Sequence, residues 1–237
     1  MANLIPARLL AAGLALAVST SPAWAATPAP APFTATYQVL QGGSVIGEAV
    51  VSLKATGDGQ WEYSNQTRGT AGLAAALGAN TSDTTRFRWN NGAPETVTYD
   101  SRVNAFKVKQ RHTQVDWNSK QVSVDEGKGP DTYAAVPGLI DRNTTSYAIG
   151  LALRDGKKQV TLPVAVRKNV ENQQYKVAAT ENVNVPAGQF KAERVERTDT
   201  DKAFSAWYVP GKYVVPVKLA QSEGGGLTLQ LVKYEGR

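Results

Sequence analysis

Residues 33–53, FTATYQVLQGGSVIGEAVVSL, contain two alternating segments separated by a pair of glycines. In the first segment, apolar residues occupy every second position, and threonine or glutamine lies between them. Side chains of a β-strand point alternately to opposite faces, so this pattern predicts a half-buried strand. Gly42-Gly43 supplies a tight turn, and Val45–Leu53 resumes the alternation. Trp61–Thr67 then predicts a return strand, which completes a three-stranded meander.

The same alternation recurs along the chain, with turn residues between its segments. The clearest turn is Asn91-Gly92, a pair that readily adopts positive φ angles, between Thr84–Trp89 and Glu95–Ser101. Residues 116–125 predict one more hairpin around Asn118-Ser119. Further strands are expected at 106–112, Val160–Val166, Gln174–Glu181, Lys191–Thr198, Phe204–Val209, Tyr213–Leu219 and Leu227–Tyr234. About a dozen short strands of this kind predict a mostly β fold, either an antiparallel, strongly curved sheet or an open β-barrel, in one domain over 33–237.

Two segments depart from the strand pattern. Ile140 to Leu151 has helical spacing, with Asp141 or Asn143 available to cap its start and Asp155-Gly156 to end it, so we expect one central helix. Residues 69–82 are rich in alanine and carry no charge, which favours a short apolar helix or loop. That segment either plugs one end of the sheet or forms a mobile lid over an apolar cavity, with glycines as hinges.

The N-terminus has the pattern of a cleavable signal peptide over residues 1–25. Arg8 supplies a positive charge, Leu9–Val18 an apolar run too short to span a bilayer, and Ala23-Trp24-Ala25 a cleavage site. An Ala/Pro-rich tether follows at 26–32. We therefore expect a secreted, periplasmic protein of the cell envelope that does not span a membrane after cleavage. Charges on both faces of Glu193–Arg197 also argue against a strand that faces lipid.

Composition narrows the classes of function. The chain has no cysteine, which excludes disulfides, thiolate nucleophiles and cysteine-based metal sites. Its net charge is +6, and +5 without the signal peptide, too small a bias to predict nucleic-acid binding. The excess of positive charge indicates either ordinary solubility or attraction to anionic lipid head groups or envelope glycans.

Three groups of residues carry a family resemblance. They are Glu181–Phe190 (ENVNVPAGQF) followed by Ala192, Trp207–Pro210 together with Val215–Lys218, and Gly72-Leu73 together with Asn91-Gly92-x-Pro94. With these residues the chain resembles exported bacterial proteins of domain of unknown function 3108. The resemblance covers nearly the whole mature chain. It implies a periplasmic antiparallel β fold, open-barrel in form and similar to lipoprotein or lipid carriers, and it transfers no catalytic residue.

The sequence offers little for catalysis. His112 is the only histidine, so it cannot belong to a multi-histidine metal site, and we interpret it as a hydrogen-bonded imidazole on a sheet face rather than a general base. The carboxylate pairs Asp125/Glu126 and Asp199/Asp201 would act on a glycosidic bond only across a cleft, and are otherwise typical of turns. We assign no catalytic residue, no metal and no cofactor.

Apolar and aromatic side chains are the better candidates for binding. The expected ligand-binding residues are Leu73, Leu77, Trp89, Trp117, Trp207 and Tyr208. Aromatic residues on strands also form ordinary core, so these side chains line a pocket only if the sheet encloses one. Lys107, Lys109 and Arg111 alternate with Phe106, Val108, Gln110 and His112, and form either a basic rim or a solvated outer face.

Three functions remain open at this point. The first is a non-catalytic periplasmic carrier or binding protein for an apolar or amphiphilic ligand, such as a lipid. The second is an envelope scaffold that binds another protein through a sheet edge or an exposed patch, without a small ligand. The third is an enzyme that acts on envelope glycans, which would need paired carboxylates in one cleft, with Asp116 and Asp141 as residues to test.

Overall fold

The computed structural model describes residues 29–105, 107–222 and 226–236 of the 237-residue chain. The elements are β1 (Phe33–Gln41), β2 (Ser44–Ala55), β3 (Gln60–Gly69), α1 (Gly72–Ala76), β4 (Asn80–Asn90), β5 (Ala93–Asn104), β6 (Val108–Asp116), β7 (Gln121–Asp125), β8 (Pro130–Ala134), α2 (Thr145–Arg154), β9 (Gln159–Ala165), β10 (Val170–Val185), β11 (Gly188–Arg197), β12 (Phe204–Tyr208), β13 (Lys218–Gln221) and β14 (Leu227–Gly236). The expected signal peptide and Phe106 lie outside the described residues, and the expected tether is described only from residue 29.

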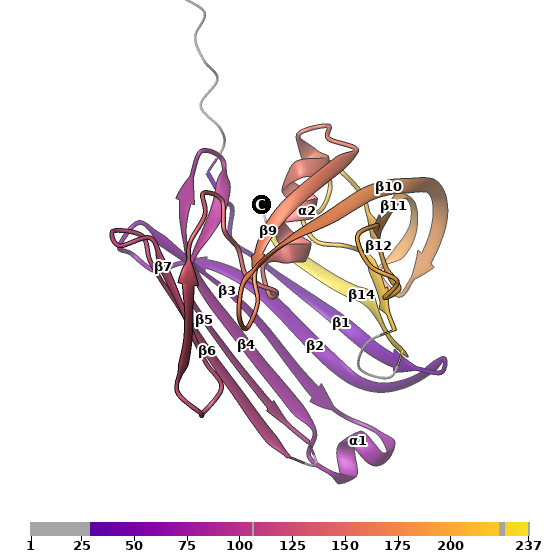
Figure 1. Cartoon of the computed structure of the whole chain (residues 1–237). Coiled ribbons are helices and arrows are strands. Elements are labelled where there is room, and N and C mark those ends of the chain that lie inside the picture. The colour runs from indigo at the N-terminus through magenta and orange to yellow at the C-terminus, as the bar shows by residue number, and fades with distance from the viewer. Residues whose placement is uncertain (1–28, 106, 223–225, 237) are drawn as a thin grey trace, which may run out of the picture.

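All fourteen strands belong to one antiparallel sheet, which curls without closing (Figure 1). Their order in space is β8-β7-β6-β5-β4-β3-β2-β1-β14-β13-β12-β11-β10-β9. Strands β1 to β8 and strands β9 to β14 are therefore two meanders, each built from neighbours in sequence. The pairing of β1 with β14 joins the two meanders. The predicted fold class, a mostly β, antiparallel and strongly curved sheet with one central helix, is confirmed.

The first hairpin pairs the two predicted strands, with Phe33 opposite Leu53 and a register shift between Val39 and Leu40. One face of β1 is buried in the main core and at most 4% exposed; its side chains are those of Phe33, Ala35, Tyr37 and Val39. The turn between β4 and β5 also has the predicted form. Asn91 and Gly92 adopt φ angles of 49° and 80°, as a tight hairpin turn requires.

Helix α2 occupies the space around which the sheet curls (Figure 1). Eight of its ten residues are buried, so the helix is enclosed on nearly all sides. Tyr147 and Leu151 belong to the core that β1 to β4 contribute to, whereas Ile149 and Leu153 pack with residues of β10 to β12. The predicted central helix is confirmed, and it fills the interior with its own side chains.

Gly150 lets one segment of backbone cross α2 at close range. A Cβ atom at Gly150 would lie 2.0 Å from the backbone oxygen of Val214, so a larger residue could not occupy this position without movement of the chain. The expected strand over Tyr213–Leu219 is wrong for this reason. Residues 209–216 cross the helix instead of entering the sheet. Val217 then donates to Trp207 O at 2.7 Å and accepts from Leu231 N at 2.8 Å, and β13 begins at Lys218. Tyr37 Oη donates a hydrogen bond of 2.9 Å to the carbonyl of Pro216, which has no N–H to offer a strand.

The basic residues of β6 lie on the inner face of the sheet and not on the solvated outer face. Lys109 and Arg111 lie on the same face as the buried Thr113 and Val115, and Val108 and His112 lie on the opposite face, exposed to solvent. The reversal has a simple cause. The inner face of the sheet is covered by α2 only along part of its length, so charged residues can lie on that face where the cover ends.

A short segment links one end strand of the curled sheet, β9, to β5, which lies near the other end. The carbonyl of Leu139 accepts a hydrogen bond of 2.9 Å from the Thr96 N–H on β5. Ile140 then pairs with β9, donating to Pro163 O at 2.9 Å and accepting from Ala165 N at 2.7 Å. Residues 139 and 140 therefore bridge β5 and β9, which are not neighbours in the sheet.

Candidate functional site

A buried polar cluster lies at the start of α2. Asp141 is fully buried, and its carboxylate accepts hydrogen bonds from Thr85 Oγ1 at 2.9 Å and from Thr96 Oγ1 at 2.7 Å. The same carboxylate accepts the backbone N–H groups of Asn143 at 2.9 Å and Thr144 at 3.2 Å. Asp141 therefore caps the turn that leads into α2 and fixes that turn to β4 and β5. The helix cap predicted at Asp141 or Asn143 is therefore wrong in detail: the N-cap of α2 is Thr144, without a side-chain cap hydrogen bond, and Asp141 holds the turn before it. The strand partners of Asp141 were not predicted.

Burial raises the pKa of Asp141 to about 6, although four hydrogen bonds to the carboxylate oppose this change. A raised carboxyl pKa is one mark of an acid-base residue. Here the side chain is enclosed, however, and cannot touch a substrate in this conformation. The cluster positions the helix, and nothing in its geometry exposes a reactive atom.

The expected ligand-binding residues do not converge on one place. Leu73 lies on α1 with 66% of its surface exposed, far along the sheet from α2, and α1 has no buried residue (Figure 1). Neither interpretation of 69–82, a plug in an end of the sheet or a lid over a cavity, matches this position. Leu77 is the C-cap of the same helix. Trp89 packs at the margin of the main core, near the turn between β4 and β5.

The remaining aromatic residues each have a local structural partner. Trp117 donates to the carbonyl of Thr96 at 2.9 Å, and the Arg88 guanidinium lies 4.2 Å from its ring centre. Trp207 and Tyr208 are adjacent on β12 and point to opposite faces. Trp207 packs in the main core, and the buried Tyr208 donates 3.0 Å to the carbonyl of Ser146 on α2.

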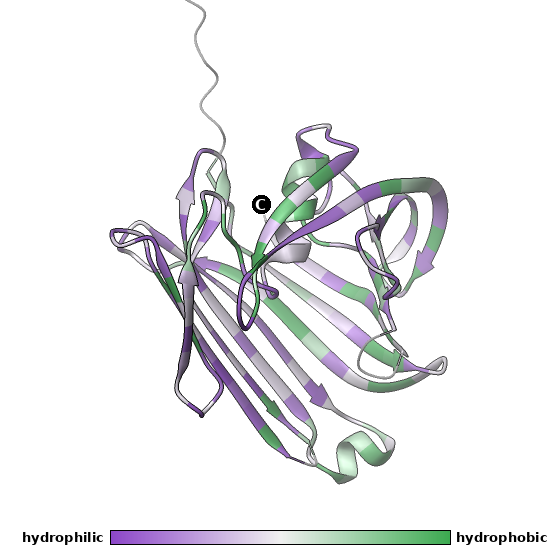
Figure 2. Cartoon of the chain, in the orientation of Figure 1, coloured by the Kyte–Doolittle hydropathy of each residue, from purple (hydrophilic) through white to green (hydrophobic). Residues whose placement is uncertain are grey.

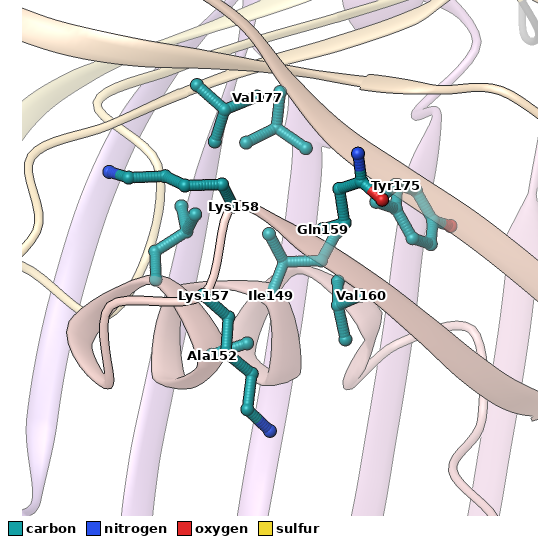
Figure 3. A pocket seen from close by; sticks show the side chains of 10 residues that line it. Ile149, Ala152, Lys157, Lys158, Gln159, Val160, Tyr175 and Val177 are labelled. Atoms are coloured by element: carbon teal, nitrogen blue, oxygen red, sulfur yellow. The ribbon is translucent and has the colours of Figure 1, made fainter.

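Two pockets stand out among the described residues, and neither resembles the cavity of an apolar carrier. The enclosed one lies between α2, β9 and β10, is lined by residues such as Ile149, Val160 and Tyr175, and holds about 10 Å³ (Figure 3). Such a volume is scarcely enough for one water molecule. The other, of about 360 Å³, is a shallow depression on the β10–β11 hairpin between polar residues and Phe190. Pockets for drug-sized ligands are larger than the first and more apolar than the second.

A polar patch occupies the part of the inner face that α2 leaves uncovered. We call it the polar inner patch, and it consists of five partly exposed residues: Asn65, Thr67, Thr81, Asp83 and Ser101. Strand register places Asn65, Asp83 and Ser101 in one row and Thr67 and Thr81 in the next. Tyr99, one step closer to α2, donates to Asp83 at 2.9 Å.

The sequence contains a signal for this patch. Along β3 the inward positions change from Tyr63, which is buried, to Asn65 and Thr67, which are polar. An alternating strand that becomes polar on both faces indicates the point where its cover ends. Figure 2 shows the corresponding change, because the lower parts of β3 and β4 are white to purple.

Apart from Asp201, the titratable residues singled out in the sequence have structural partners. His112 Nδ1 lies 2.7 Å from Asp100 Oδ1 on the outer face, with both side chains more than half exposed. Asp125 and Asp116 accept backbone N–H groups in turns. The remaining carboxylates are held by arginines, since Glu126 pairs with Arg111 and Asp199 with Arg197.

The three basic residues expected at a rim divide into two kinds. Lys107 and Lys109 are exposed, on either side of the exposed Val108. Arg111 is partly buried, and its charge is already balanced by an ion pair with Glu126. It is therefore less suited than the two lysines to contact an anionic ligand. Within the described ranges, no group of three or more His, Cys, Asp or Glu residues is arranged to hold a metal ion.

The architecture and the sequence agree with one family model. The model for a protein of unknown function, DUF3108, matches residues 33–232, which include every strand from β1 to β13 and most of β14. The chain belongs to the DUF3108 family. The resemblance drawn from the turn and core motifs is thereby confirmed. No curated protein matches this DUF3108 chain.

Solved structures of similar outline are distant from this DUF3108 chain. One is the β-barrel-like protein of domain of unknown function DUF1849 from Brucella abortus, at 12% identity and a TM-score of 0.49, with 87% of this chain and 98% of that chain covered. Another, from Bacteroides fragilis, is described as exported and as having a YmcC-like fold, at 11% identity and a TM-score of 0.33, with 86% and 94% covered. In the described part of the DUF3108 chain, no helix is long and apolar enough to cross a membrane.

Proposed function

We propose that the protein is a non-catalytic binding module of the cell envelope that engages another protein through the polar inner patch. The observation that carries this proposal is the filled interior of the sheet. Because α2 and its aromatic neighbours occupy the space that a carrier would reserve for an apolar ligand, recognition falls to exposed surface. An envelope location rests on the signal-peptide pattern at the N-terminus.

The chemistry of the polar inner patch suits a polypeptide. Its carboxylate, carboxamide and hydroxyl groups offer both donors and acceptors, as the backbone of an extended peptide requires. These side chains are short and lie on strands, so little side-chain entropy is lost when they become ordered against a partner.

Position-specific photocrosslinking in cells tests this proposal. A photoreactive residue at Thr67 faces the patch, whereas one at Gln66, its neighbour on β3, faces the opposite side and serves as the matched control. We expect a discrete protein adduct from position 67 and none from position 66. Equal labelling at both positions, or no adduct at either, would contradict the proposal. Stoichiometric lipid in native mass spectra would favour the carrier instead.

A further inference from the structure

One end of the sheet exposes apolar side chains that no core uses. Among the described residues, five large apolar residues are exposed, and three of them are Val45 (45%), Leu73 (66%) and Val108 (53%). They lie in the β1–β2 turn region, on α1 and at the start of β6, at the same end of the strands (Figure 1). We call this surface the α1 end, formed by residues 42–46, 70–79, 104–105 and 107–109.

Strand register confirms that these connections are neighbours. Arg68 at the end of β3 pairs with Asn80, Asn80 with Asn104, and Asn104 with Val108. The N–H of Thr70 donates to Ile46 O on β2 at 2.9 Å, which ties α1 to the β1–β2 hairpin. The three exposed apolar side chains therefore project from adjoining connections.

The fold holds α1 in a fixed position. A Cβ atom at Gly69 would lie 2.6 Å from the backbone carbon of Ala74, so glycine allows the helix to turn back closely on β3. The Gly69 N–H donates to Ala79 O at 2.7 Å and closes the loop at its base. An uncharged, alanine-rich helix is thus fixed where it can bury nothing within the described chain, and Figure 2 shows it as a hydrophobic element at the tip of a mostly polar sheet.

The charge around the α1 end is positive. Arg68 and Glu48 neutralise each other in an ion pair of 2.9 Å. Arg102, Lys107 and Lys109 remain, all exposed, and residues 42–48, 66–82 and 102–110 contain no acidic residue other than Glu48. Exposed apolar side chains beside lysines are the combination that binds the surface of an anionic bilayer, where the apolar groups enter the acyl boundary and the cations meet head groups.

From these observations we propose that the α1 end docks the protein onto a bilayer surface rich in anionic lipid. Leu73 and Val108 enter the interface, and Lys107 and Lys109 contact lipid head groups. The α1 end adjoins the polar inner patch, because strand register places Lys109 in the row of Thr67 and Thr81, but the apolar residues Leu73 and Val108 lie outside that patch. A flat bilayer fits better than a protein partner, because the apolar residues project singly from three connections. Neither of the two pockets described above includes any of these residues.

Sedimentation with lipid vesicles tests the proposal, using the purified protein and two vesicle compositions. One is phosphatidylcholine alone and the other contains about one-third phosphatidylglycerol. We expect binding to the anionic vesicles only, weakened by salt. Leu73→Asp should lower the partition constant at least tenfold, and the double variant K107E/K109E at least about 25-fold, since each lysine near an anionic surface contributes about fivefold.

Val232→Asp is the matched control. Val232 is exposed to 42% on β14, away from the α1 end, so this variant adds the same charge without touching the proposed surface. This variant should bind the anionic vesicles as well as the unaltered protein does. The midpoints of thermal unfolding of all variants should agree within a few degrees. Absence of vesicle binding by the unaltered protein, or an equal loss in Val232→Asp, would overturn the proposal. Vesicle binding with no adduct at position 67 would refute only the proposed protein partner.

Discussion

Replacement of Asp141 by asparagine should remove a specific dependence of stability on pH. Asparagine keeps the shape of the side chain and an oxygen for the Thr85 hydroxyl and the two backbone N–H groups, but it cannot ionise. The pKa of Asp141 is about 6 in the folded protein against 3.8 ordinarily. The folded state therefore retains a proton that the unfolded state releases, and its stability falls as pH rises from about 4 to about 6.

The magnitude follows from the two pKa values. Each pH unit between them corresponds to about 1.4 kcal/mol, so ionised Asp141 costs the folded state about 3 kcal/mol at pH 7. Urea unfolding followed by tryptophan fluorescence at pH 4 to 8 measures the effect. The free energy of unfolding of wild type minus that of Asp141→Asn should fall by about 2.5 kcal/mol across this range, because all other titrating groups cancel in the difference.

Asp141→Ala supplies the control. It removes the same ionisation but leaves the hydroxyls of Thr85 and Thr96 and two buried N–H groups without their acceptor, at a cost of about 1 to 3 kcal/mol for an unsatisfied group. Its curve against pH should therefore run parallel to that of Asp141→Asn and lie below it. A difference between wild type and Asp141→Asn that stays constant from pH 4 to 8 would refute the assignment of a raised pKa to this carboxyl.

Three further substitutions test the packing around α2 and a buried ion pair. Gly150→Ala should lower stability by about 3 kcal/mol in urea unfolding, because its Cβ would meet Val214 O; a loss no greater than that of Ser146→Ala on the same helix would contradict this. Tyr208→Phe should cost about 1 kcal/mol through loss of the bond to Ser146 O, visible as a lower midpoint of denaturation. Arg88→Met should cost about 2 kcal/mol at pH 7, since it removes the cationic partner of the buried Glu95 carboxylate, which keeps its hydrogen bonds from Asn90 and the Gly138 N–H. Burial alone would raise the pKa of Glu95, but hydrogen bonds from the Gly138 N–H, Arg88 and Asn90 lower it, so the stability it contributes is lost as pH falls. The penalty of Arg88→Met should therefore shrink below about pH 4, and a penalty independent of pH would count against it.

Local patterns were sufficient to predict the hairpins. Alternation within a strand and the positive φ angles of Asn91-Gly92 depend on neighbouring residues alone, and both appear in the structure. The central helix was predictable for the same reason, since its spacing and the turn that Asp141 holds before it lie within one short segment.

Features that depend on distant residues were not predictable. Asp141 is held by Thr85 and Thr96, which lie 56 and 45 residues away in sequence. Tyr213–Leu219 alternates like a strand, but Tyr37 and α2 hold residues 213–216 outside the sheet, and β13 begins only at Lys218. The tryptophans were expected to share a pocket, yet a large ring is equally suited to any gap in a core, and nothing local distinguishes the two uses.

The contact between β1 and β14 sets the order in which the molecule can be completed. The first strand lies in the middle of the sheet and has one neighbour, β2, from the start, but its second neighbour is the last strand of the described chain. Until β14 is in place, β1 presents an unpaired edge of alternating apolar residues to solvent, a state prone to aggregation. A chain that stops before β14 should therefore associate with other chains rather than fold, and assembly of the intact protein should be slow, since it waits for contacts that span about 200 residues.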